Sequence, residues 1–274
     1  MATVMNDVSF ESYLQLPALS QSTLKAGRKS MAHLKAALDG QRVIVPSDAM
    51  NLGSALHCAF LEPELLPAKV ALWPDGKVRR GKEWDAFNEA HTGKIILTEK
   101  MHHNFVGMIR SLRAAARNRP DLRHWCSQIE ATELTIIGEV HGVTMKGRVD
   151  AMTPGPLLDL KKVADGDMRL FRSRAYDYGY HIQAYVYTTL AERSRFIMLT
   201  VEESAPWDVV QYEVSAELMA QGKREADELL EKFKACQDSG VWPGRAHEIE
   251  SLGLPEYVGS SMSIEQLAGH EPLD

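Results

Sequence analysis

The 274-residue sequence is poor in cysteine and has no long apolar run. Its three cysteines, Cys58, Cys126 and Cys236, lie far apart and none belongs to a Cys-x-x-Cys motif. The sequence therefore supports neither a disulfide framework nor a cysteine zinc site. No segment approaches the ~20 apolar residues that a membrane helix requires. Because the first residues also lack a basic stretch followed by an apolar one, we expect a cytoplasmic protein with reduced thiols.

The short motifs of several familiar enzyme sites are absent as well. The sequence has no His-Glu-x-x-His, no Gly-x-Ser-x-Gly and no Gly-x-Gly-x-x-Gly. Residues 76–82 fit the Gly-x-x-x-x-Gly-Lys pattern of a phosphate-binding loop, but Glu83 follows where that loop needs a Ser or Thr hydroxyl for magnesium. No internal repeat is present, which argues against solenoids and propellers.

Acidic residues outnumber basic ones, 37 against 31, but their distribution is uneven. Residues 246–274 hold six acids and no Lys or Arg, which leaves 31 of each sign in residues 1–245. Within that balanced part, residues 69–82 carry five basic residues and one acid, and residues 100–123 carry six and one. Local positive surface can coexist with an acidic total. Each segment can also be an ordinary solvated surface, so charge alone leaves both interpretations open.

Capping residues predict helices in the first half of the chain, and apolar strands predict a sheet in the second half. Helices first, then a sheet, then a helix packed on it are typical of one α/β core. The expected helix caps are Ser20, Ser30, Ser47 and Thr98, with helices over residues 31–38, 48–61 and from 99 to just before Pro120. We expect a loop at 74–82, strands at 131–140, 143–152, 157–163, 196–202 and 209–214, and helices at 168–193 and 216–237.

The clearest chemical signal lies on two of these strands. Gly147-x-x-Asp150 is followed, after eight residues, by Asp159-Leu160-Lys161. If the strands are adjacent, the two aspartates lie side by side, and the two-residue period of a strand puts Asp159 and Lys161 on one face. Adjacent carboxylates suit magnesium or manganese, and a nearby lysine can orient a water or stabilise charge on a phosphate. The alternative is an exposed ion pair of Asp159 with Lys161 or Lys162.

Two pairs of residues spaced four apart on helices accompany these strands. Gly53 and His57 share one helix face, where Gly53 would let another backbone approach and His57 could be a metal ligand or a hydrogen-bonded core histidine. Gln183 and Tyr187 would likewise meet on one face, and Tyr187 alone would most often be a core residue.

Taken in order, Gly53-x-x-x-His57, Gly147-x-x-Asp150, Asp159-x-Lys161 and Gln183-x-x-x-Tyr187 resemble the RecB-type branch of the PD-(D/E)XK nuclease superfamily. More closely, the chain resembles the exonuclease VIII (RecE-like) family of phage and prophage exonucleases over roughly residues 10–258. The segments that carry this likeness include LPALSQSTLKAGRKSMAHLKA, NLGSALHCAFLEPE, RRGKEW, YGYHIQAYVY and Val241-Trp242-Pro243-Gly244. One departure is that Lys162 and Val163 stand where the family usually has small hydroxyl residues.

The resemblance implies an α/β fold with a PD-(D/E)XK nuclease-like core, in which helices flank a central mixed sheet. It also implies a site for two Mg²⁺ ions, for which Mn²⁺ can substitute. The implied metal ligands are His57, Asp150, Asp159, the Leu160 carbonyl and Glu133. The implied catalytic group is Lys161 with Asp150 and Asp159, while Gln183 and Tyr187 position the substrate or Lys161.

By the same resemblance, the protein would degrade linear duplex DNA from the 5′ end and leave 3′ single strands for a phage-type annealing recombinase. Such exonucleases form rings around DNA, so we expect a trimer or tetramer. The alternatives are a structure-specific endonuclease on the same core and a non-catalytic DNA-binding or scaffold protein. The complete set of His57, Asp150, Asp159 and Lys161 argues against the scaffold.

Two further expectations concern DNA contacts and chain organisation. Arg79, Arg80 and Lys82 would contact the DNA backbone without reading its sequence. Residues 1–258 would form a single exonuclease domain, with a helical part at 1–128 and a sheet-containing catalytic core at 129–237. Residues 259–274 would form an acidic tail.

Overall fold

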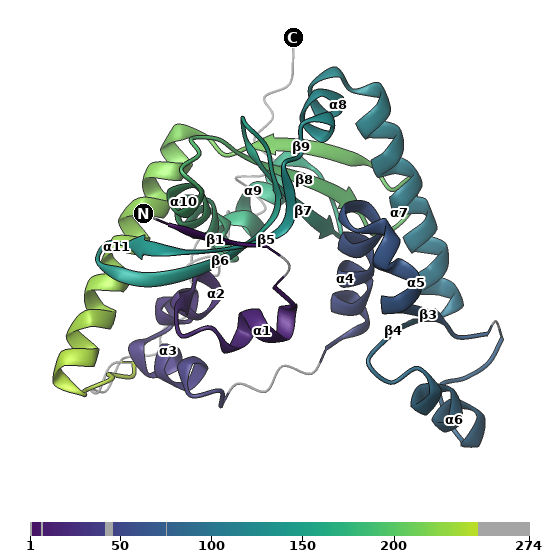
Figure 1. The fold of residues 1–274 in the computed structure, drawn as a ribbon, viewed down its shortest axis with the longest axis horizontal. Coiled ribbons are helices and arrows are strands. Elements are labelled where there is room, and N and C mark those ends of the chain that lie inside the picture. Colours follow the sequence, from purple (N-terminus) through teal and green to yellow (C-terminus); the bar gives the residue numbers. More distant parts are fainter. Residues whose placement is uncertain (1, 7, 42–45, 75, 246–274) are drawn as a thin grey trace, which may run out of the picture. The chain divides into compact units, whose positions relative to one another are not determined.

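A mixed sheet of seven strands forms the centre of the fold (Figure 1). The computed structural model describes residues 2–6, 8–41, 46–74 and 76–245, and the features below belong to the unit Met1–Pro243. The strands lie in the order β1-β5-β6-β7-β8-β9, and β2 pairs with β6. They are β1 Thr3–Met5, β2 Leu19–Ser20, β5 Ala131–Val140, β6 Val143–Met152, β7 Leu157–Val163, β8 Phe196–Glu202 and β9 Val209–Glu213.

Two neighbouring strands at the centre of the sheet, β6 and β7, are paired over only part of their length. β5 and β6 pair antiparallel along their whole length through the tight turn His141-Gly142, where both residues have positive φ. β7 and β8 are parallel, with two helices between them in the chain. In contrast, β6 and β7 pair only at Ala151↔Leu158 and Met152↔Leu157. Beyond these positions the two strands separate.

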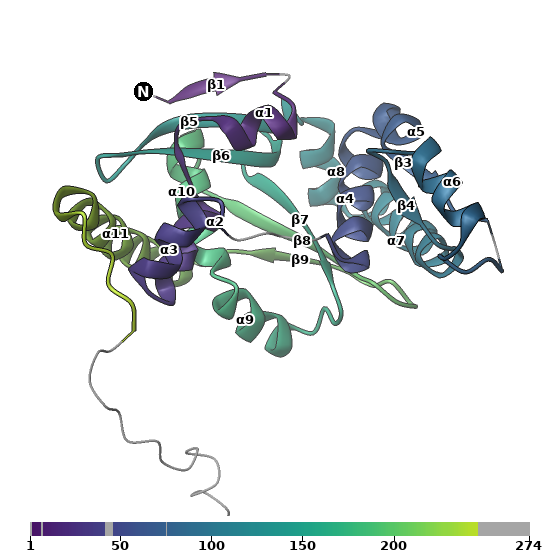
Figure 2. The same cartoon turned by 90° about the horizontal axis from the view of Figure 1, so that it is seen from below.

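Alternating side chains of the sheet fill two cores on its opposite faces. In the first core, Phe196 and Met198 of β8 pack with the helices α2, α3, α10 and α11. In the second core, Leu199 and Val201 of β8 pack with α4 and α7. In Figures 1 and 2 these two helix groups lie on either side of the sheet. The helices are α2 Gln21–Leu24, α3 Met31–Leu38, α4 Asp48–Leu61, α7 Glu99–Asn118, α10 Tyr180–Ala191 and α11 Ala216–Ser239.

Smaller elements complete the unit. A two-stranded parallel sheet of β3 and β4 lies beside α7 in the second core. None of the helices in the described ranges is long and apolar enough to cross a membrane. The elements not yet placed are α1 Phe10–Gln15, α5 Leu66–Lys69, α6 Lys82–Ala90, α8 Pro120–Ser127, α9 Met168–Asp177, β3 Val70–Leu72 and β4 Ile95–Leu97.

The expected fold class, a central mixed sheet flanked by helices, is confirmed. The predicted caps also hold, since Ser20, Ser30, Ser47 and Thr98 each accept a hydrogen bond from a backbone amide three residues later.

Two expectations about local structure are wrong. The single helix at 168–193 is two helices, α9 and α10, because Gly179 adopts a left-handed conformation with φ +65° between them. Gly53 does not receive a close backbone, since a Cβ built there meets no heavy atom of the described residues within 4 Å. The expected acidic tail at 259–274, and the end of the expected domain at 258, lie outside the described residues.

Candidate active site

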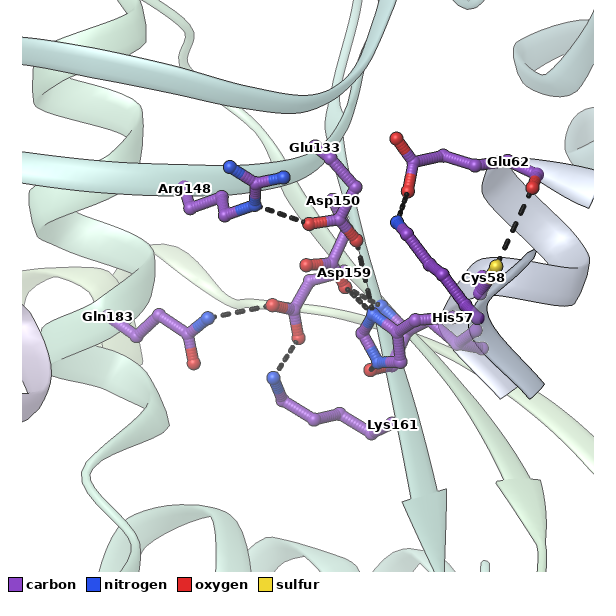
Figure 3. Close-up of polar contacts among 11 residues, drawn as sticks. His57, Cys58, Glu62, Glu133, Arg148, Asp150, Asp159, Lys161 and Gln183 are labelled. Carbon is purple, nitrogen blue, oxygen red and sulfur yellow. Dashed lines mark hydrogen bonds and ion pairs between the residues drawn. The ribbon is translucent and has the colours of Figure 1, made fainter. Parts of the chain in front are cut away.

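Asp150 and Asp159 lie at the point where β6 and β7 separate (Figure 3). The backbone amide of Leu160 donates a hydrogen bond of 2.7 Å to Asp150 Oδ2, which ties the first aspartate to the strand that carries the second. Asp159 and Lys161 share one face of β7, as strand alternation requires, and Leu160 points to the opposite core. The separation of the strands gives side chains from both faces of the sheet access to this point.

His57 reaches this point from α4. Its Nε2 lies 2.9 Å from the carbonyl oxygen of Leu160, and its Nδ1 lies 3.4 Å from Asp150 Oδ2 and 3.8 Å from Glu133 Oε1. Burial lowers the pKa of His57, but the Asp150 and Glu133 carboxylates outweigh that effect and raise it to about 9. The two carboxylates therefore favour a positive charge at this position, carried by a proton on Nδ1 or by a cation bound to it.

Glu133 turns toward the same point through an unusual backbone conformation. It lies within β5 opposite Asp150, yet its φ is +48°, and the regular pairs run from Thr132↔Ala151 to Leu134↔Val149 on either side of it. A left-handed conformation costs a non-glycine residue about 1–3 kcal/mol and is concentrated at functional sites. Arg148 Nε donates a hydrogen bond of 2.7 Å to Glu133 Oε2, so that Oε1 is left facing His57.

Asp159 is held by Gln183 and Lys161. Gln183 Nε2 donates a hydrogen bond of 2.7 Å to Asp159 Oδ1, and Lys161 Nζ lies 2.7 Å from Oδ2 without the alignment of a hydrogen bond. The Asp159 side chain is only 2% exposed. Lys161 Nζ also lies 4.9 Å from the centre of the Tyr180 ring. Asp159 Oδ2 is thus a buried carboxylate oxygen that can accept a further ligand bond.

Tyr187 lies one helical turn beyond Gln183 on α10 and is buried in the first core. Its ring packs on Gly147 of β6, where a Cβ would lie 2.9 Å from Tyr187 Cε1. Burial raises the pKa of the Tyr187 hydroxyl above its usual range. This contact fixes the distance between α10 and β6, and therefore the position of Gln183 on α10.

The arrangement concentrates negative charge in a place with little water. Burial raises the pKa of Asp150 to about 6, although the His57 ring acts in the opposite direction. Burial would also raise the pKa of Glu133, but His57 and Arg148 outweigh it and hold that pKa below its usual value. A buried carboxylate with a raised pKa binds a proton or a metal ion more readily than a solvated one.

The residues at this point fit a divalent metal ion. His57, Glu133 and Asp150 each offer one ligand atom, and these atoms lie within 4.8 Å of one another. The Leu160 carbonyl oxygen lies beside His57. The Asp159 carboxylate is not one of these three ligands, since its Oδ2 pairs with Lys161, but it is near enough to raise the pKa of Asp150. Carboxylate and carbonyl oxygens favour Mg²⁺ or Mn²⁺, and an imidazole nitrogen is a better ligand for the transition metal than for magnesium. The donor set therefore suits Mn²⁺ at least as well as Mg²⁺.

The structure brings together most of the residues singled out from the sequence. They form two contact groups that the backbone of β7 joins (Figure 3). One consists of His57, Glu133, Asp150 and the Leu160 backbone, and the other of Asp159, Lys161 and Gln183. The basic segment does not belong to either group. Arg79 makes two hydrogen bonds, of 2.8 and 2.9 Å, to the carboxylate of Asp48, whereas Arg80 and Lys82 are exposed and have no ion pair among the described residues.

Arg148 and Tyr180 belong to the site but were not expected from the sequence. Arg148 lies two residues before Asp150, and this spacing alone indicates that the two share a strand face. Its second hydrogen bond, of 2.7 Å from Nη1 to the carbonyl oxygen of Val8, depends on the N-terminal segment and had no local signal. Tyr180 faces Lys161 only because the chain turns at Gly179.

Comparisons with known proteins agree with this fold. Residues 20–255 match the family model described as "PDDEXK-like domain of unknown function (DUF3799)". The structure of a "Putative exonuclease" from Eubacterium rectale is similar in fold, with a TM-score of 0.63 and 15% identity over 97% of this chain and 99% of that one. A phage related exonuclease from Haemophilus somnus 129PT gives a TM-score of 0.37 and 14% identity over 83% and 97%, which is too low to support an argument.

A comparison with curated proteins found no match. The family model nevertheless covers most of the sequence, and the described fold is that of its superfamily. Family and fold together support a nuclease. The chain belongs to the PDDEXK-like DUF3799 family, and through it to the PD-(D/E)XK nuclease superfamily.

Proposed function

We propose that this protein is a metal-dependent exodeoxyribonuclease that hydrolyses phosphodiester bonds of linear double-stranded DNA. The observation that carries the proposal is the adjacency of two groups. His57, Glu133 and Asp150 offer metal ligands within 4.8 Å of one another, and the Asp159–Lys161 ion pair lies on the neighbouring strand β7, near enough for Asp159 to raise the pKa of Asp150. Phosphodiester hydrolysis needs both a cation for the phosphate oxygens and a group beside the attacking water.

The residues of the site divide into ligands, a cationic donor and positioning groups. His57, Glu133, Asp150, Asp159 and the Leu160 carbonyl would hold the metal. Once bound, the metal would polarise a phosphate oxygen and lower the pKa of a bound water. Burial would lower the pKa of Lys161, but the Asp159 and Asp150 carboxylates raise it above its usual value. Lys161 is therefore protonated in the metal-free site, and it would act on the phosphate or on the attacking water.

Gln183 and Tyr187 act through other residues in this proposal. The Gln183 amide holds one oxygen of Asp159 and leaves the other toward Lys161. Tyr187, packed on Gly147, keeps the helix that carries Gln183 in place.

The finer parts of the proposal rest on the resemblance to the exonuclease VIII (RecE-like) family. We propose two Mg²⁺ ions per site, replaceable by Mn²⁺, and degradation from the 5′ end that leaves 3′ single strands for an annealing recombinase. We also propose a ring-shaped trimer or tetramer in the cytoplasm. Arg80 and Lys82 of the basic segment are free to contact the DNA backbone, while Arg79 would have to exchange Asp48 for a phosphate.

The test compares a linear duplex, labelled at either end, with a covalently closed circle, in Mg²⁺ or Mn²⁺. We expect only the linear DNA to be degraded. Asp159→Asn and Lys161→Ala should each lower the rate by several orders of magnitude, and calorimetry should show weakened metal binding only in Asp159→Asn, because an ammonium has no lone pair for a cation. Lys162→Ala is the matched control, since Lys162 pairs with Glu203 and not with Asp159.

The alternatives give different results in the same assay. Cleavage of the closed circle would favour a structure-specific endonuclease. If wild-type protein cleaves neither DNA with either metal, the scaffold interpretation is correct. Equal rates for wild type and both site variants would show that the chemistry occurs elsewhere.

A further inference from the structure

Helix α9 carries three exposed arginines, and the chain beyond its C-terminal end leads to Tyr180, whose ring centre lies 4.9 Å from Lys161 Nζ. Only Phe171 and Ala175, four residues apart, are buried, and they attach α9 to the first core. The rest of the helix is exposed, including Arg169, Arg172 and Arg174. Figure 2 shows α9 standing apart from the other helices, beyond the strand β9. Tyr176 adds a hydrogen bond to Glu225 and a stack on His181, and the arginines lie outside these contacts.

The three arginines of α9 have no ion-pair partner among the described residues. In contrast, Arg28, Arg148 and Arg193 each pair with a glutamate. The two aspartates before the helix, Asp165 and Asp167, accept hydrogen bonds from backbone amides, and Asp167 caps the helix. The α9 arginines are therefore not needed for an ion pair within the described part of the fold, and their charge is open to an anionic partner.

An exposed aromatic ring follows α9 on the side of the active site. Tyr178 is 61% exposed, and its ring centre lies 5.7 Å from that of Tyr180, which in turn lies 4.9 Å from Lys161 Nζ. Lys25 Nζ donates a hydrogen bond of 3.1 Å to the Tyr178 carbonyl oxygen, and Arg28 donates to the two preceding carbonyl groups. The backbone is thus held in place while the Tyr178 ring faces solvent.

We propose that Arg169, Arg172, Arg174 and Tyr178, together called the α9 surface, bind an unpaired DNA strand next to the bond that is cleaved. This inference rests on the proposed function. The arginines would hold backbone phosphates, and Tyr178 would stack on a base. Arg169 and Arg172, three residues apart, share one side of the exposed part of α9, and Arg174 shares the other side with Tyr178, four residues on. A bound strand would therefore cross the helix from one side to the other, over a rise of ~7.5 Å between Arg169 and Arg174.

The aromatic ring decides between an unpaired strand and a duplex. In a duplex both faces of an internal base are covered by its neighbours, so an exposed ring gains little from it. An unpaired base offers its face to an aromatic side chain, and each such stack strengthens binding measurably without reading sequence. A surface for duplex alone would need the arginines but not Tyr178.

Binding without cleavage tests this proposal. Affinity is measured in EDTA, as a function of salt, for a single-stranded oligonucleotide, for a blunt duplex and for the same duplex with an unpaired end. A 2-aminopurine in the unpaired strand reports stacking by loss of its fluorescence. The variants are Arg169→Gln/Arg172→Gln/Arg174→Gln, Tyr178→Ala and Tyr178→Phe. Arg224→Gln is the control, because Arg224 lies on α11 and bonds only to Gln221 among the described residues.

The arginine variant should lower the slope of log affinity against log salt for single-stranded DNA by about 2, since each phosphate contact on a single strand contributes ~0.7. Tyr178→Ala should weaken binding of the unpaired end roughly 5- to 100-fold and abolish the quenching, without affecting the blunt duplex. Tyr178→Phe and Arg224→Gln should behave as wild type. An unchanged salt slope, or equal losses for blunt duplex and unpaired end, would overturn the proposal.

These results are independent of the nuclease test. If the wild type cleaves DNA and the α9 variants bind all three DNAs normally, the α9 surface is wrong and the proposed function stands. If the wild type cleaves nothing but the arginine and Tyr178 variants lose single-strand binding, the surface stands and the proposed function fails.

Discussion

Arg148 holds Glu133 in place, and its replacement tests how the candidate metal site is built. Its guanidinium donates hydrogen bonds of 2.7 Å to Glu133 Oε2 and to the Val8 carbonyl oxygen. The Arg148 and Glu133 side chains are 15% and 17% exposed. In Arg148→Met, Glu133 loses its hydrogen-bond donor, so its carboxylate is no longer held with Oε1 facing His57. Metal affinity should therefore fall by about 10- to 100-fold, as it does when groups that orient metal ligands are removed.

The same replacement should lower the free energy of unfolding by about 2–4 kcal/mol, because a largely buried charged hydrogen bond and a bond to the N-terminal segment are lost. Arg193→Met is the control, since Arg193 also donates to a glutamate, Glu130, and to backbone carbonyl groups, those of Thr153 and Ala191. Titration calorimetry with Mn²⁺ and urea unfolding measure the two quantities. If Arg148→Met binds the metal as tightly as wild type, the role assigned to Arg148 is refuted. Both variants should be less stable than wild type, but only Arg148→Met should also bind the metal more weakly.

Two glycines, one buried lysine and one lysine with a lowered pKa each predict a measurable change. In Gly147→Ala the new Cβ would lie 2.9 Å from the Tyr187 ring, so the free energy of unfolding should fall by about 1–3 kcal/mol. In Gly53→Ala the new Cβ meets no atom of the described residues within 4 Å, so α4 should be stabilised by about 0.5–1 kcal/mol, and urea unfolding compares the two variants. Lys146 Nζ donates hydrogen bonds to the carbonyl groups of Tyr13, Leu14 and Leu16. Lys146→Met should therefore release α1 from the sheet and increase amide hydrogen exchange in residues 10–16 before it does so elsewhere. Unchanged exchange in these residues would contradict this role of Lys146. Burial and the nearby Lys161 lower the pKa of Lys25 from 10.5 to about 8, so between these pH values the unfolded chain keeps a proton that the folded protein has released. The free energy of unfolding of wild type, relative to that of Lys25→Met, should therefore rise with pH across this window. A difference that does not change with pH would show that the pKa is not lowered.

Local sequence signals were sufficient for most of the secondary structure. Ser47 and Pro63 enclose α4, Thr98 and Pro120 enclose α7, and the strands β5, β6 and β7 have the residues expected from their apolar and β-branched composition. These signals are local because a cap or a proline acts on amides within one turn. The break between α9 and α10 was missed because a glycine gives no clear local signal: Gly179 could lie inside a helix, and only its left-handed conformation in the fold separates the two helices.

Strand alternation also predicted part of the site. It is enough to place Asp159 and Lys161 on one face, because successive strand residues point in opposite directions whatever the rest of the fold does. Spacing of four on a helix likewise put Gln183 and Tyr187 on one side of α10, but it did not show that Gln183 would bond to Asp159 while Tyr187 packed on Gly147.

The sequence by itself determined the order of the elements, the residue types at the site and the shared faces, because these depend on contacts within a few residues. Tertiary structure alone decided which of those faces meet. The separation of β6 from β7, the left-handed backbone at Glu133 and the approach of His57 from α4 each require segments far apart in the chain. The exposure of the α9 arginines also depends on segments far apart in the chain. A local pattern does not show which side of a helix the rest of the described fold covers.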